Sequence, residues 1–207
     1  PAMTEAECAR AMAYGMMAVE DGVDALCLGE MGIGNTTSAA AICCALFGGS
    51  ASDWVGAGTG VTGDALERKK TAVEDAMALH GAAFDDPFEV LRCLGGHELS
   101  AIAGAVLAAR IARVPVLLDG YACTAAAAIL NRIESTALDH CLVGHLSAEP
   151  GHCRLVEQLG QTPVLDLKMR LGEGTGATVA LGVLRAAISC HIGMATFAEA
   201  RVDGPAG

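Results

Sequence analysis

Short apolar runs and longer helix-forming stretches follow one another along this chain. Four times, a β-rich apolar run leads into a turn that contains glycine or an acidic residue, and then into a stretch typical of a helix. These runs are residues 24–28, 114–118, 141–143 and 163–165. Such an order is typical of βα units, in which parallel strands form an open sheet covered by helices.

The helical stretches have recognisable starts and packing patterns. Thr4-Glu-Ala-Glu7 has the form of a capping box, which predicts a helix running to about Glu20. The stretch 98–112 carries small apolar residues nearly all round and is expected to be buried. The other predicted helices are residues 36–47, 71–79, 121–132, 175–192 and 194–201.

The expected fold is α/β: an open, mostly parallel, doubly wound Rossmann-like sheet flanked by helices. At 207 residues the chain is long enough for one domain with a real core, so a single domain over 1–207 is expected. Residues 1–20 and 194–207 are expected to be peripheral, with the terminal helices forming a small helical lobe.

Composition narrows the choice of partners. A formal net charge of −11 opposes binding to nucleic acid, and the scattered basic residues do not suit an anionic membrane surface. The apolar stretches fall short of the length that suggests a membrane span. Cys43 and Cys44 are adjacent and no C-x-x-C occurs among nine cysteines, which favours reduced thiols in a cytoplasmic protein.

In an open α/β sheet, the ligand crevice lies beyond the carboxyl ends of the strands. The turns that follow the four predicted strands should therefore meet at one edge of the sheet. They would bring acidic and hydroxyl side chains together there, namely Glu30, Asp119, Ser147, Glu149 and Glu173. Asp119 could also cap the helix that follows it.

A glycine-rich turn, residues 29–37, precedes one predicted helix. The backbone N–H groups of Gly32, Gly34 and Thr36 would point at an anion held by the helix dipole, with Lys69 beside them. The turn matches neither the dinucleotide fingerprint nor the P-loop. A structural glycine-rich turn and a ligand-binding loop are equally compatible with this pattern.

Glu173 stands between glycines at the end of the last predicted strand. The glycines remove side-chain bulk, so a flat ligand could approach the carboxylate and raise its pKa toward that of a useful base. Helix N-capping by the acidic residue is the simpler alternative.

Taken as a set, these segments resemble the nicotinate-nucleotide:dimethylbenzimidazole phosphoribosyltransferases, which make the lower-ligand nucleotide of cobalamin. The likeness extends over nearly the whole chain. It is carried by Gly29 to Thr37, Arg68-Lys69, Gly95-Gly96, Glu98, Leu118 to Gly120, Gly144 to Ser147, Glu149-Pro150, Arg170 to Ala177 and Met194 to Phe197.

The resemblance implies transfer of phosphoribose from nicotinate mononucleotide to 5,6-dimethylbenzimidazole, with Glu173 as general base. It places Glu30, Gly32 and Lys69 in the nucleotide site, Gly120, Ser147 and Ala148 on loops around the ribose phosphate, and Leu171 in the benzimidazole pocket. The neighbouring Gly34, Asn35, Thr36, Asp119 and Gly172 are further substrate-binding candidates. The resemblance also implies a homodimer.

Members of that family carry a substantial N-terminal portion before the point that matches Pro1, and this portion supplies part of the benzimidazole pocket. No cofactor is expected. Six histidines suggest a metal site, but His97, His145 and His152 lie in separate segments without ligand spacing, so no metal is expected. A Rossmann-type oxidoreductase and a non-catalytic nucleotide-binding domain remain as alternatives.

Overall fold

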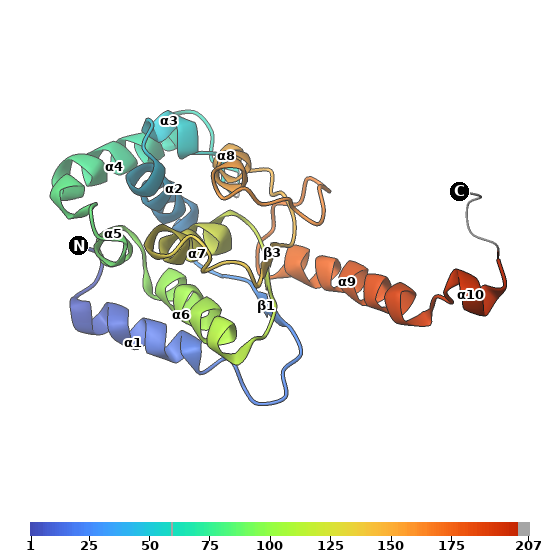
Figure 1. The fold of residues 1–207 in the computed structure, drawn as a ribbon. Coiled ribbons are helices and arrows are strands. Elements are labelled where there is room, and N and C mark those ends of the chain that lie inside the picture. The colour runs from blue at the N-terminus through green and yellow to red at the C-terminus, as the bar shows by residue number, and fades with distance from the viewer. Residues whose placement is uncertain (59, 203–207) are drawn as a thin grey trace.

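The computed structural model describes residues 1–58 and 60–202 and has an open parallel sheet with helices on both of its faces (Figure 1). The elements in chain order are α1 (Glu5–Met16), β1 (Leu26–Leu28), α2 (Asn35–Phe47), α3 (Ala51–Trp54), α4 (Asp64–His80), the short 3-10 helix η1 (Gly81–Ala83), α5 (Pro87–Leu94), α6 (His97–Ala112), β2 (Val116–Leu118), α7 (Tyr121–Ile133), β3 (Cys141–Val143), α8 (Pro150–Gln158), α9 (Thr175–Gly193) and α10 (Phe197–Ala200).

The sheet confirms the predicted parallel α/β class. Its three strands run in the order β1-β2-β3, with Leu28 opposite Leu118 and Leu118 opposite Val143. Residues 163–165, expected as a fourth strand, form only an isolated parallel bridge between His145 and Leu165. Val164 donates to the carbonyl of Val143 at 2.9 Å and Leu165 accepts from Leu146 at 2.8 Å. Because Pro163 has no N–H to donate, it cannot extend this pairing upstream into a regular ladder.

Alternate residues of β2 face two different packing layers. Val116 and Leu118 belong to the large hydrophobic core on the side of α2, α6 and α7, whereas Leu117 faces the other way and packs with Ala177 and Ala180 of α9. This alternation is the period of a strand that is buried on both faces. It places the start of α9 directly under the strands.

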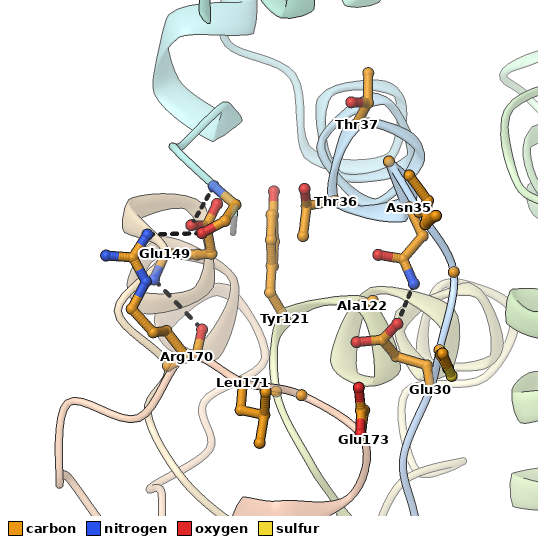
Figure 2. A pocket seen from close by; sticks show the side chains of 18 of the residues that line it. Glu30, Asn35, Thr36, Thr37, Tyr121, Ala122, Glu149, Arg170, Leu171 and Glu173 are labelled. Atoms are coloured by element: carbon orange, nitrogen blue, oxygen red, sulfur yellow. Dashed lines mark hydrogen bonds between the residues drawn. The ribbon is translucent and has the colours of Figure 1, made fainter. Parts of the chain in front are cut away.

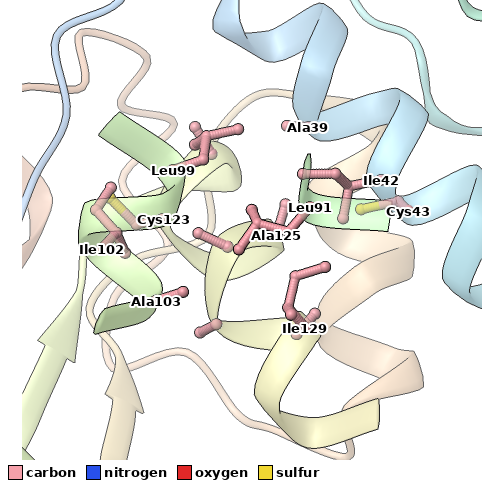
Figure 3. Close-up of a cluster of buried hydrophobic side chains, with 14 of the residues drawn as sticks. Ala39, Ile42, Cys43, Leu91, Leu99, Ile102, Ala103, Cys123, Ala125 and Ile129 are labelled. Carbon is pink, nitrogen blue, oxygen red and sulfur yellow. The ribbon is translucent and has the colours of Figure 1, made fainter. Parts of the chain in front are cut away.

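The larger core is built mostly from small side chains around α7 (Figure 3). Every residue of α7 from Tyr121 to Leu130 is buried. Alanines in this helix let α2, α5 and α6 approach closely, so tight backbone packing replaces the aromatic side chains that the composition lacks. As expected, α6 is largely buried too.

The two terminal helices lie apart rather than in one lobe. The capping box of α1 is present, but the helix ends at Met16 instead of Glu20, and it packs along α6. Figure 1 shows α9 and α10 extending away from the body. The terminal helices do not share a lobe because α1 buries one face on α6 while only the first turns of α9 contact the sheet. Of the predicted peripheral segment 194–207, residues 203–207 lie outside the described residues.

Candidate active site

A cavity of about 410 Å³ opens at the carboxyl ends of the strands, where the strand-to-helix turns were expected to meet. This volume suits a small-molecule ligand. Most of the predicted site residues line it: Glu30, Gly32, Gly34, Asn35, Thr36, Lys69, Gly120, Ser147, Leu171, Gly172 and Glu173.

Asp119 and Ala148 are the two predicted site residues that do not line the cavity. Asp119 lies beneath it, where its carboxylate accepts hydrogen bonds from the backbone N–H of Gly174 at 3.1 Å and of Ala177 at 2.9 Å. It therefore caps α9, and not the helix that directly follows it. Ala148 is exposed, and its N–H donates to the carbonyl of Met169 at 3.1 Å.

The Glu173 turn is held against the Glu30 turn by backbone contacts. The N–H of Glu173 donates to the carbonyl of Glu30 at 3.1 Å. A Cβ on Gly29 would lie 2.2 Å from the backbone nitrogen of Gly174, so glycine is required at this crossing. The glycines therefore serve the close approach of two loops that are distant in sequence.

Glu173 itself has φ of +59°, in the left-handed region that non-glycine residues seldom adopt. Gly172 and Gly174 on either side also have positive φ, at +81° and +77°. Holding Glu173 there costs free energy that the surrounding contacts must supply, and such residues gather at functional sites. The result is an exposed carboxylate directed into the cavity (Figure 2).

Glu30 faces Glu173 across this end of the cavity, and the side-chain amide of Asn35 donates to one of its carboxylate oxygens (Figure 2). Burial raises the pKa of Glu30, while the hydrogen bond from Asn35 opposes the rise. The start of α2 was predicted to receive an anion. Because a carboxylate already lies there, a second anion would be repelled from this part of the turn.

Lys69 lies on α4 with its ammonium group directed inward. The side chain is buried, and Nζ donates to Oγ1 of Thr36 at 2.8 Å and to the carbonyl of Gly56 at 2.9 Å. Burial lowers the pKa of Lys69, and the nearby charge of Glu149 opposes this. Lys70, the next residue along the helix, pairs instead with Glu67 at 2.8 Å.

A second group of charged side chains lies on the opposite side of the cavity from Glu30 and Glu173 (Figure 2). Oε1 of Glu149 accepts from the N–H of Gly58 at 2.7 Å, and Nη2 of Arg170 donates to the carbonyl of the same glycine at 2.8 Å. Glu149 was expected at this edge without a role, and Arg170 was not proposed for the site. The cluster of glycines at 56, 58, 60 and 63 is the sequence signal that could have pointed to this loop.

Two histidines from separate segments come together at the cavity wall, where His145 lines the cavity and His152 lies behind it. The rings of His145 and His152 have centroids 6.4 Å apart in an edge-on arrangement, and Nε2 of His145 lies 3.6 Å from Oδ1 of Asp119. Among the described residues, no three His, Cys, Asp or Glu side chains gather in a way that could hold a metal ion.

His152 is expected to remain neutral well into the acid range. Burial, followed by repulsion from His145, lowers its pKa to about 3. The unfolded chain would take up a proton at this histidine near pH 6.5 that the folded chain cannot, so its contribution to stability is lost as pH falls from there toward 3. Nuclear magnetic resonance titration should show no ring protonation of His152 between pH 8 and about 4.5. A midpoint near 6.5 would contradict the buried, neutral state.

This combination of a parallel α/β sheet, glycine-rich turns and a carboxylate-lined cavity defines a small-molecule enzyme site. A family model described as Phosphoribosyltransferase matches residues 1–202. The chain therefore belongs to this phosphoribosyltransferase family.

Relatives and solved structures agree with this assignment. The chain is 64% identical over 203 residues to the nicotinate-nucleotide--dimethylbenzimidazole phosphoribosyltransferase of Rhizobium etli (strain CFN 42). The matched region covers 98% of this chain and 60% of the relative. The protein of the same name from Methylocella silvestris is 60% identical over 207 residues, covering 100% and 61%. A crystal structure of CobT from Thermus thermophilus superimposes with a TM-score of 0.91 at 46% identity, covering 98% of this chain and 62% of that one. The chain thus spans about 60% of the length of these curated relatives.

Proposed function

We propose that this chain transfers phosphoribose from nicotinate mononucleotide to 5,6-dimethylbenzimidazole, releasing nicotinate and forming α-ribazole 5'-phosphate for the lower ligand of cobalamin. The observation that carries the proposal is the carboxylate of Glu173, held at a strained backbone position and directed into a cavity that Glu30 also lines. The names of the relatives support the same reaction.

The reaction needs one base and no strong acid. Nicotinate leaves from a pyridinium nitrogen, so breaking the glycosidic bond neutralises a positive charge. Attack by one nitrogen of the benzimidazole makes that ring cationic until its other N–H is removed, and Glu173 accepts this proton. The neighbouring carboxylate of Glu30 stabilises positive charge that develops on the sugar.

The positions of the charges divide the cavity into two ends. The acceptor base lies against Glu173, with Leu171 and the exposed apolar side chains of Met31 and Ile33 beside it. The phosphate lies toward the other end, near Lys69 and Arg170, with Gly120 and Ser147 on the adjoining loops. The carboxylate at the start of α2 disfavours the phosphate position that the sequence predicted.

If the phosphate anchors the nucleotide, nicotinate riboside should bind at least about tenfold more weakly than nicotinate mononucleotide, because a charge-assisted hydrogen bond is worth more than a neutral one. Calorimetry with both ligands measures the difference. Arg170→Gln should reduce the difference between the two affinities, because it weakens the binding of the mononucleotide and not that of the riboside. Equal affinity for riboside and mononucleotide would rule out a phosphate anchor in this cavity.

The activity itself is tested by incubating the full natural chain with nicotinate mononucleotide and 5,6-dimethylbenzimidazole and following α-ribazole 5'-phosphate by chromatography. The 207-residue chain is assayed beside it across a series of acceptor concentrations. A weaker response to the acceptor in the shorter chain is expected if upstream residues complete the benzimidazole pocket. Absence of product from the full chain would remove the proposed reaction.

A homodimer in the cytoplasm completes the proposal, and α9 is the surface that supports it. One face of α1 is covered because it lies on α6. By contrast α9 has a mean hydropathy of 1.4 over 18 residues that are only 17% buried. Contrary to the expectation from the sequence, it satisfies the length and composition of a membrane span. Ala177 and Ala180 in its first turns are buried against the sheet. Because the first turns of α9 are anchored in this way, we infer that the rest of its apolar surface packs against a second copy of the chain and not against lipid.

A further inference from the structure

His152 lies behind the cavity wall and has no part in the proposed chemistry. It belongs to α8, is completely buried and does not line the cavity. Both of its ring nitrogens nevertheless have polar partners: Ser147 on the loop after β3, and Thr124 in the first turn of α7. A buried imidazole with both nitrogens engaged fixes the groups on either side of it.

The donors and acceptors in this network can be assigned from one fixed donor. The backbone N–H of Ser147 donates to Nδ1 of His152 at 3.0 Å, so Nδ1 carries no proton. In the neutral ring the proton is then on Nε2, which lies 3.1 Å from Oγ1 of Thr124 and donates to it. The hydroxyl of Thr124 donates in turn to the carbonyl of Gly120 at 2.9 Å.

Gly120 and Ser147 are the two cavity residues joined by this chain of hydrogen bonds. They lie on the loops after β2 and β3, and a Cβ on Gly120 would be 3.6 Å from Cβ of Ser147, so the loops touch at this point. The hydroxyl of Ser147 lies 3.0 Å from the same Nδ1 atom. Rotation of the imidazole would therefore alter the orientation of the Ser147 side chain as well as its backbone.

We propose that His152 and Thr124 form a positioning pair that fixes the Gly120 turn relative to the Ser147 loop and thereby sets the affinity of the cavity for its nucleotide. The nature of the ligand rests on the proposed function, whereas the hydrogen-bond chain does not. The pair touches neither substrate nor reacting atoms. The pair affects the binding of the substrate and not the proton transfer at Glu173.

Two substitutions at Thr124 separate positioning from packing. Thr124→Val keeps the shape but removes the hydroxyl, so the N–H on Nε2 of His152 is left buried without its acceptor. The KM for nicotinate mononucleotide should rise about tenfold, the equivalent of one lost hydrogen bond of about 1.4 kcal/mol, while kcat changes by less than about threefold. Thr124→Ser loses a methyl group but keeps the hydroxyl, so its KM should stay within about threefold of the unmodified protein.

Ser189→Ala is the matched control, because the Ser189 hydroxyl makes the same kind of bond, to the carbonyl of Arg185 on the distal part of α9. It should leave KM unchanged. If Thr124→Val and Thr124→Ser lower stability alike and neither shifts KM, the pair is merely structural and the proposal is overturned. A rise in KM with Thr124→Val alone supports it.

The tautomer is measured in the unmodified full chain and needs no activity. Nitrogen chemical shifts of labelled histidine should place the proton of His152 on Nε2, and the Ser147 amide should be protected from hydrogen exchange. A proton on Nδ1 would overturn the positioning pair even if the enzyme is active. Conversely, an inactive full chain with the predicted tautomer would overturn the proposed reaction and leave the hydrogen-bond chain standing.

Discussion

Replacing Glu173 by Gln is expected to lower turnover in the full chain by about a hundredfold or more while the affinity for nicotinate mononucleotide changes little. Glutamine has the same length and can occupy the same turn, but its amide cannot accept the proton of the benzimidazole. The change therefore removes an interaction made in the transition state and leaves ground-state binding intact. Steady-state kcat and calorimetric Kd together measure the two effects.

Glu30→Gln is the comparison that tests this assignment, because Glu30 lines the same end of the cavity. Its loss should reduce turnover less, since in the proposed reaction Glu30 supplies charge stabilisation but takes no proton. Near-normal turnover in Glu173→Gln would mean that water or another carboxylate serves as base. A domain that only binds nucleotide would show no transfer in any variant, including the unmodified chain.

The sheet was predictable where apolar runs were compact and bounded by turns. The runs at 24–28, 114–118 and 141–143 contain β1, β2 and β3, because buried parallel strands consist of continuous apolar residues. The run at 163–165 has similar composition but lies at the edge, where a proline removes one donor. Composition alone does not distinguish a central strand from an edge bridge.

Three α-helices, α3, α5 and α8, were not predicted, although the starts of α5 and α8 carry a clear signal. The side chain of Asp86 caps α5 and Pro87 occupies its first turn. At α8, Glu149 holds the cap position without a side-chain capping bond, and Pro150 follows it. Proline at the first helical position after an acidic cap favours a helix start. Prediction from apolar periodicity alone does not detect these short helices. Of the two, α8 carries His152.

The loops of the cavity were predictable, but the contacts between them were not. Glycine-rich turns after the strands indicated where Glu30 and Glu173 would lie. The role of Asp119 depends on a segment more than fifty residues later in the chain. The N–H groups of Gly174 and Ala177 in that segment donate to its carboxylate. The burial of Lys69 likewise depends on how α4 lies against Thr36, a tertiary feature without a local pattern.

Gly104→Ala is expected to destabilise the chain by about 3 kcal/mol, because α6 and α1 approach too closely there to admit a side chain. A Cβ at Gly104 would lie 2.0 Å from the backbone carbonyl oxygen of Met12, and one at Gly15 would lie 1.7 Å from that of Ala101. Both obstructing atoms are backbone, so relief requires α1 to move as a unit. Urea unfolding curves of the variant and the unmodified chain measure the loss.

Gly182→Ala makes the same substitution in the middle of α9, where nothing beyond the adjoining helix backbone lies within 4 Å of the new methyl group. Alanine favours a helix over glycine by up to about 1 kcal/mol, so this variant should be slightly more stable. The two expected changes in stability have opposite signs. This separates steric exclusion from helix propensity, since propensity alone would make both variants more stable. A stabilising effect of Gly104→Ala would therefore show that α1 can draw away from α6 at little cost, and that the small residues between these helices do not determine their spacing.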